Sequence, residues 1–126
     1  MNRWIALGAL LGFLGVALGA FGAHAIRDRI TPDLLAIYQT GVHYHQIHAL
    51  ALVGLGLWEG QKGSTKTTTA AGIALLMGIL IFSGTLYLLA ITGTRWWGAI
   101  TPIGGLSLQI GWICFAVSAW KRPPHV

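Results

Sequence analysis

Charged side chains are scarce in this chain. Only 9% of its 126 residues are Asp, Glu, Lys or Arg, whereas a soluble domain carries about 25%. Three residues are acidic, and none of them lies inside a long apolar run. The net charge of +5 comes from basic residues at the ends of these runs, which is typical of membrane orientation and headgroup contact and not of nucleic-acid binding. The sequence therefore predicts an integral membrane protein.

Sequence features of catalysis are also missing. The single cysteine, Cys114, excludes an internal disulfide. No apolar run contains a carboxylate, and the chain has neither a nucleophile–base pair nor a phosphate-binding loop. We therefore expect a protein that is not an enzyme and that needs no cofactor.

What the chain has instead is four long apolar runs, with 55% hydrophobic residues overall. The runs cover about residues 4–26, 42–58, 69–91 and 102–120. Each can cross a bilayer, which takes about 20 helical residues, provided that the second run extends upstream. Thr101 and Pro102 are typical of a helix start and predict that the last span begins there. The predicted fold class is all-α, an integral membrane four-helix bundle with a single domain over residues 1–126.

The connection between the first two runs leaves two alternatives. Residues 31–33, Thr-Pro-Asp, are typical of a helix N-terminus. Residues 34–38 then form either a short interfacial helix that bends at Gly41, or the first turns of one continuous, tilted helix over residues 32–58.

Glycines in the first run alternate between spacings of four and three residues, a 3.5-residue period that predicts one seam along a helix. Such a seam lets another helix approach closely inside a bilayer. Its members are Gly8, Gly12, Gly15, Gly19 and Gly22. Gly104 and Gly105 are predicted to let the last span pack in the same way, whereas the glycines of the third run are too irregularly spaced to predict a second seam. A cleaved signal peptide is the alternative for the first run, but the run is longer than a signal core.

Lys and Arg residues in the short loops predict the orientation of the spans. One side holds five and the other holds three, so both termini are predicted to be cytoplasmic. The five are Arg3, Lys62, Lys66, Lys121 and Arg122, and the three are Arg27, Arg29 and Arg95. Aromatic residues predict the two interfaces, with Trp4, Trp58 and Trp120 inside and Trp96, Trp97 and Tyr38 outside.

Polar side chains gather near the outer ends of the predicted spans. The candidate cluster consists of His24, Tyr44, His45, His48, Ser83, Tyr87 and Thr101. Ionisable groups inside a membrane are costly and are usually paired or functional. Three hypotheses follow. In the first, neutral side chains hydrogen-bond across the bundle and set its register. In the second, His24, His45 and His48 hold a metal ion, or two histidines from different helices ligate a haem iron. In the third, the cluster handles protons or a ligand. Gln109, deep in the last run, is expected to find a partner on another helix.

Four motifs occur in order along most of the chain. They are residues 19–25 (Gly-Ala-Phe-Gly-Ala-His-Ala), Tyr44 with residues 48–52, residues 82–87 (Phe-Ser-Gly-Thr-Leu-Tyr), and residues 100–105 (Ile-Thr-Pro-Ile-Gly-Gly) with Gly111 and Trp112. With these motifs the chain resembles the YgdD/YwdK-like family of small bacterial membrane proteins, a domain of unknown function. The resemblance implies four transmembrane helices in a bacterial inner or plasma membrane, and it implies no reaction.

These features favour a packing and interaction module that supports membrane integrity. Its expected partners are membrane lipids, a second copy of the chain or another membrane protein, and not nucleic acid. One alternative is a membrane protein that binds a metal or haem through histidines. The other is a small transporter, which would have to act as an oligomer because four short helices leave little room for a pathway in one protomer.

Overall fold

Four helical rods make up the computed structural model, which describes residues 2–121. The first rod joins α1 (Arg3–Phe21) to a π-helical turn, η1 (Gly22–Ile26), and the second is α2 (Pro32–Lys62). The third joins α3 (Lys66–Gly78), a π-helical turn η2 (Ile79–Ser83) and α4 (Gly84–Thr92). The fourth is α5 (Trp97–Trp120). No strand occurs in residues 2–121, and the predicted all-α four-helix bundle is confirmed.

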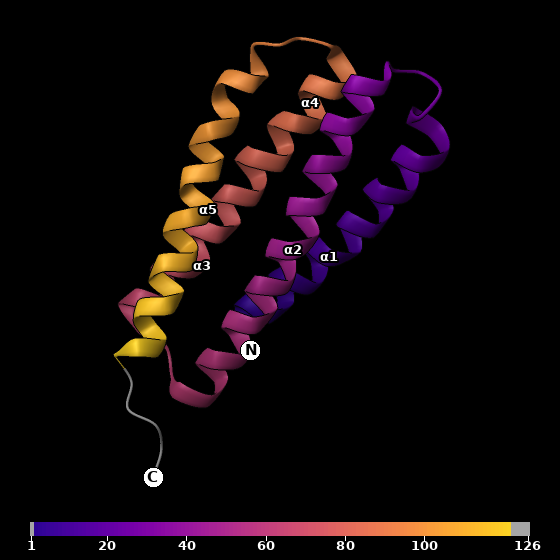
Figure 1. Ribbon diagram of the computed structural model, residues 1–126. Coiled ribbons are helices and arrows are strands. Elements are labelled where there is room, and N and C mark those ends of the chain that lie inside the picture. Colours follow the sequence, from indigo (N-terminus) through magenta and orange to yellow (C-terminus); the bar gives the residue numbers. More distant parts are fainter. Residues whose placement is uncertain (1, 122–126) are drawn as a thin grey trace.

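The second rod, α2, lies in the middle of the bundle (Figure 1). It packs along α1 on one side and against α3, η2 and α4 on the other, while α5 covers the third rod. Leu52 and Leu55 of α2 are completely buried, and Leu75 of α3 is buried in the same cluster. The central helix is therefore the one whose side chains are enclosed by neighbours on both sides.

Three helical segments are long and apolar enough to cross a membrane: Arg3–Ile26, Lys66–Thr92 and Trp97–Trp120. The central helix α2 is not among them, although it has 31 residues. Residues 43–48 contain three histidines, a tyrosine and a glutamine, which lower its hydropathy.

The α2 helix is continuous, so the separate interfacial helix expected at residues 34–38 is wrong and the continuous alternative is right. Thr31 has extended backbone, Pro32 follows at the first helical position, and Asp33 lies in the first turn. Tyr38 holds the first turns in the bundle, because its ring is only 1% exposed and its hydroxyl donates to the Leu18 carbonyl at 2.5 Å. Tyr38 is therefore a core residue and not an interfacial aromatic.

The α5 helix begins at Trp97, five residues before the predicted start at Pro102. Pro102 lies inside the helix, where its missing N–H removes one backbone bond in the second turn. Neighbouring contacts hold this turn against the third rod, because the Thr101 hydroxyl bonds to the Thr85 hydroxyl at 2.7 Å and Gly104 lies directly against the backbone of Phe82.

The glycine seam of α1 faces α2 at four of its five positions. A Cβ atom at Gly8 would lie 2.7 Å from the Ala49 carbonyl oxygen, one at Gly15 would lie 2.8 Å from the Gln46 side chain, and one at Gly19 would lie 3.4 Å from Val42. Gly22 lies against the ring of Tyr38. Gly12 has no atom within 4 Å of that position, so the seam prediction does not hold there. At about 100° per residue, Gly12 lies about 40° from Gly8, at the edge of the stripe.

A second set of glycine contacts joins the third rod to α5, and of these only the packing of Gly104 and Gly105 was predicted from the sequence. Gly78 lies against Leu108, Gly111 lies against Leu75, and Gly104 lies against Phe82, while Gly105 makes only ordinary contact with the Phe82 ring at 3.6 Å. The parts of Gly78 and Gly111 were not predicted from spacing, because the glycines of this interface are divided between two helices.

Candidate functional site

His45 of α2 is a buried polar side chain that contacts both α1 and α4, with 4% of its surface exposed. Its Nε2 lies 2.7 Å from the Leu11 carbonyl oxygen, and its Nδ1 lies 2.8 Å from the Tyr87 hydroxyl. A carbonyl oxygen only accepts, so Nε2 carries the proton. In the neutral ring Nδ1 then accepts from the Tyr87 O–H, so the Leu11 contact selects one of the two neutral tautomers.

His48 has the opposite tautomer. Its Nδ1 donates to the Tyr44 carbonyl at 2.6 Å, and its Nε2 accepts from the indole N–H of Trp112 on α5 at 3.0 Å. An indole nitrogen is only a donor, so Nε2 must be unprotonated. All four ring nitrogens of the two buried histidines therefore take part in hydrogen bonds inside the bundle.

Three further members of the predicted cluster join helices in pairs. The Ser83 hydroxyl donates to the Gly41 carbonyl at 2.7 Å, which connects η2 to α2. The Thr101 and Thr85 hydroxyls bond at 2.7 Å between α5 and α4, and Tyr87 bonds to His45. These hydroxyls therefore find their partners inside the bundle, on a backbone carbonyl or on other side chains.

The structure does not bring His24, His45 and His48 together. His24 is exposed on η1, and Tyr44 is 41% exposed and packs on the Phe82 ring. The two buried histidines contact different neighbours, because α2 lies between α1 and α5 and residues three apart differ by about 60° around a helix. Within residues 2–121 no three His, Cys, Asp or Glu side chains are grouped to hold a metal ion.

Two residues of α5 differ from expectation. Trp112, named above only as part of a motif, donates the hydrogen bond to His48. Gln109, expected to bond across the bundle, is exposed on the outer face of the helix. Helical spacing places residues on faces, but the neighbour of each face is set by how the rods are ordered.

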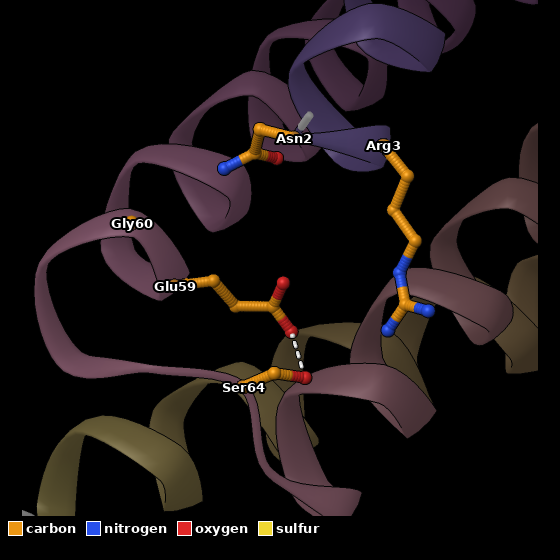
Figure 2. A pocket seen from close by; sticks show the side chains of 5 residues that line it. All are labelled: Asn2, Arg3, Glu59, Gly60 and Ser64. Carbon is orange, nitrogen blue, oxygen red and sulfur yellow. Dashed lines mark hydrogen bonds between the residues drawn. The ribbon is translucent and has the colours of Figure 1, made fainter.

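A second polar region lies at the opposite end of the bundle and was missed from the sequence. It is a pocket of about 490 Å³ between the start of α1, the end of α2 and the turn before α3. Figure 2 shows the side chains that line it: Asn2, Arg3, Glu59, Gly60 and Ser64. No signal along the chain joins Arg3 to Glu59, because they meet only after the first two rods pair.

The turn after α2 builds one wall of this pocket. Gly63 ends α2 with a φ of +84°, a conformation that favours glycine. Thr65 and Thr68 then form a capping box that starts α3. This geometry brings two hydroxyls to Glu59, whose Oε1 accepts from Thr68 at 2.6 Å and from Ser64 at 3.1 Å.

Arg3 is held on the opposite wall. Its Nη2 donates to the Thr69 hydroxyl at 3.0 Å, and its guanidinium lies 4.9 Å from the centre of the Trp4 ring. Glu59 and Arg3 are not an ion pair, and the one ion pair of residues 2–121 joins Arg95 to Asp33 at 2.9 Å. The pocket therefore keeps two opposite charges apart.

The Arg95–Asp33 pair lies at the other end of the bundle and is exposed on both sides. It joins the start of α2 to the loop before α5. The Thr31 hydroxyl and then the Arg95 guanidinium hold the pKa of Asp33 below its ordinary value. This pair serves below as a matched control for the charges of the pocket.

Comparison with known proteins gives one family and close relatives. A family described as "Protein of unknown function (DUF423)" matches residues 18–105. The UPF0382 membrane protein YwdK of Bacillus subtilis is 41% identical over 96% of this chain and 98% of its own length. The UPF0382 inner membrane protein YgdD of Escherichia coli is 38% identical over 88% of this chain and 84% of its own length. No solved structure matches the chain.

Proposed function

Since the chain belongs to the DUF423 family of membrane proteins of unknown function, we propose that it is a non-enzymatic helical module that supports membrane integrity through contacts with lipids and membrane proteins. One observation carries this proposal. The buried histidines, the residues best suited to chemistry, have all their ring nitrogens engaged by a carbonyl, a tyrosine hydroxyl or an indole. A base or a metal ligand needs a free nitrogen lone pair, so this arrangement supports a structural role.

Purified protein tests this proposal. We expect no stoichiometric metal by elemental analysis, no haem absorption band, and no turnover of lipid or quinone. His48→Ala should leave these readouts unchanged and lower the stability by about 1–3 kcal/mol, because one interhelical bond is lost and the buried ring leaves a cavity. Stoichiometric metal or a haem band that disappears in His48→Ala would favour the histidine-cofactor alternative, and solute flux in liposomes would favour the transporter alternative. Either result would overturn the proposal.

The proposed location is a bacterial plasma membrane, crossed four times, with both termini in the cytoplasm. The relative YgdD is named an inner membrane protein. The 31 residues of α2 span about 46 Å at 1.5 Å per residue, more than the roughly 30 Å of hydrocarbon, and its polar side chains are covered by neighbouring rods. The distribution of Lys and Arg supports the orientation, although Arg122 lies outside the described residues.

Reporter fusions test the orientation. Alkaline phosphatase, which is active only outside the cytoplasm, should be inactive when fused after Gly63 and active when fused after Thr94. A fluorescent protein that folds only in the cytoplasm should show the opposite pattern. Activity of alkaline phosphatase at both positions, or at Gly63 alone, would contradict the proposed topology.

The exposed side chain of Gln109 supports a second copy of the chain as the partner. Its amide is exposed midway along α5, beside a groove of about 550 Å³ lined in part by Tyr44 and Trp112. An amide in hydrocarbon is costly without a partner, and because it both donates and accepts, two copies can pair across a two-fold axis. Gln109→Leu should therefore reduce the dimer fraction seen by cross-linking in liposomes, whereas Gln39→Leu, at an exposed site near the start of α2, should not. Equal dimer fractions in wild type and Gln109→Leu would exclude this contact.

A further inference from the structure

The pocket of Figure 2 presents two opposite charges that do not neutralise each other. Each is fixed by other side chains: Glu59 by the hydroxyls of Ser64 and Thr68, and Arg3 by Thr69 and the Trp4 ring. These contacts hold the acid and the base on facing walls. A free pair on flexible side chains would close into an ion pair, so the pocket is suited to a group that carries both charges itself.

The two charged groups keep free hydrogen-bonding capacity. The Ser64 and Thr68 hydroxyls both donate to Oε1 of Glu59, and Figure 2 shows the other carboxylate oxygen directed toward the opening that Arg3 also faces. The guanidinium has five N–H donors, of which one is used by Thr69. An anionic oxygen can therefore bind at Arg3 while an ammonium donates to Glu59.

The position of the pocket indicates a lipid. It lies at the end of the bundle, where α1 begins and α2 ends, and the half-buried Trp58 comes directly before Glu59. Tryptophan is enriched at the headgroup level of membrane proteins. The start of α1 adds a favourable field for an anion, because its first N–H groups form the positive end of the helix dipole.

We propose that this pocket binds the headgroup of a glycerophospholipid that carries a primary ammonium, with the phosphodiester at Arg3 and the ammonium at Glu59. The inference rests on the proposed function of a lipid-contacting module and names its lipid class. A quaternary ammonium has the charge but no N–H to donate to Glu59. An anionic headgroup satisfies Arg3 and leaves the carboxylate facing negative charge.

Competition between lipids tests the proposal on the unmodified protein. Detergent-purified protein is mixed with equal amounts of phosphatidylethanolamine, phosphatidylcholine and phosphatidylglycerol, and bound lipids are counted by native mass spectrometry. We expect a preference of about three- to tenfold for phosphatidylethanolamine, the range for one charge-assisted bond at a partly exposed site. Stepwise N-methylation of the ethanolamine should lower binding, most sharply when the last N–H is lost. Equal binding of the ethanolamine and choline lipids by wild type would overturn the proposal.

Two variants test which part of the headgroup each charged residue binds. Glu59→Gln keeps an oxygen for the Ser64 and Thr68 hydroxyls, and it should bind the ethanolamine and choline lipids equally. Arg3→Gln should weaken binding of all three lipids. The control Asp33→Asn removes an exposed carboxylate at the other end of the bundle and should keep the wild-type preference. Retention of that preference by folded Glu59→Gln would overturn the assignment, and the N-methylation series decides the matter if the variant does not fold.

Two further measurements are informative: one distinguishes a lipid from a soluble ligand, and the other separates the headgroup assignment from the proposed non-enzymatic function. Soluble glycerophosphoethanolamine at millimolar concentration should not displace the lipid, and displacement would assign the pocket to a soluble ligand instead. Conversion of phosphatidylethanolamine to another product during incubation would refute the proposed non-enzymatic function. Absence of selective binding without any turnover would refute only the headgroup assignment.

Discussion

Replacing Gly8 by alanine should lower the stability of the bundle by about 1–3 kcal/mol, the usual cost of overpacking a tight interior. The new Cβ atom would lie 2.7 Å from the carbonyl oxygen of Ala49 and 2.9 Å from the backbone nitrogen of Val53. Neither backbone atom can rotate away, so α1 and α2 must move apart over several turns. Thermal unfolding in a mild detergent, followed by circular dichroism, measures the loss.

Gly12→Ala is the matched control on the same helix. A Cβ atom at Gly12 meets no atom within 4 Å, and alanine is a better helix former than glycine by about 1 kcal/mol. The control should therefore unfold at the wild-type temperature or slightly above it. Equal stability of Gly8→Ala and Gly12→Ala would show that the seam does not determine how closely the first two rods approach.

Among alanine substitutions of His43, His45 and His48, His45→Ala should lower the free energy of unfolding the most, by about 2–4 kcal/mol. Two hydrogen bonds disappear, a buried hydroxyl and a buried carbonyl lose a partner, and the removed ring leaves a cavity. The contacts of Leu11 on α1 and Tyr87 on α4 both depend on this ring. Denaturant titration in mixed micelles measures the change in unfolding free energy.

Two other variants separate the contribution of the Tyr87–His45 hydrogen bond from the effect of losing an exposed histidine ring. Tyr87→Phe removes only the hydroxyl that donates to His45 and should cost about 0.5–1.5 kcal/mol. His43→Ala changes an exposed ring two residues away and should stay within about 0.5 kcal/mol of wild type. If His45→Ala and His43→Ala were equally stable, the hydrogen bonds at His45 would have no role in holding α1 and α4 against α2.

The sequence predicted a helix well where all the residues that form the pattern lie within that one helix. The apolar runs predicted the rods, and the glycine period predicted the face of α1 that α2 covers. The start of α5 was placed too late, because a proline signal that usually begins a helix is accommodated here in the second turn by the contacts of Thr101 and Gly104. The interfacial helix failed for a similar reason, since burial of Tyr38 keeps the first turns of α2 in the bundle.

Five members of the candidate cluster form side-chain hydrogen bonds inside the bundle, but His24 and Tyr44 are exposed and the arrangement was not predicted. Helical spacing grouped His45 with His48, and only the order of the rods directs one ring to Leu11 and Tyr87 and the other to Trp112. The pocket between Arg3 and Glu59 had no local signal at all, because its two charges are more than fifty residues apart in the sequence.

The amino-acid sequence by itself determined that this protein is a helical membrane protein, because hydrophobicity and helical period are properties of each segment alone. The tertiary structure decided which polar groups meet, which tautomer each buried histidine adopts, and where two opposite charges share a pocket. These outcomes depend on the order and crossing of the rods, and that order is set by contacts between residues distant in the chain.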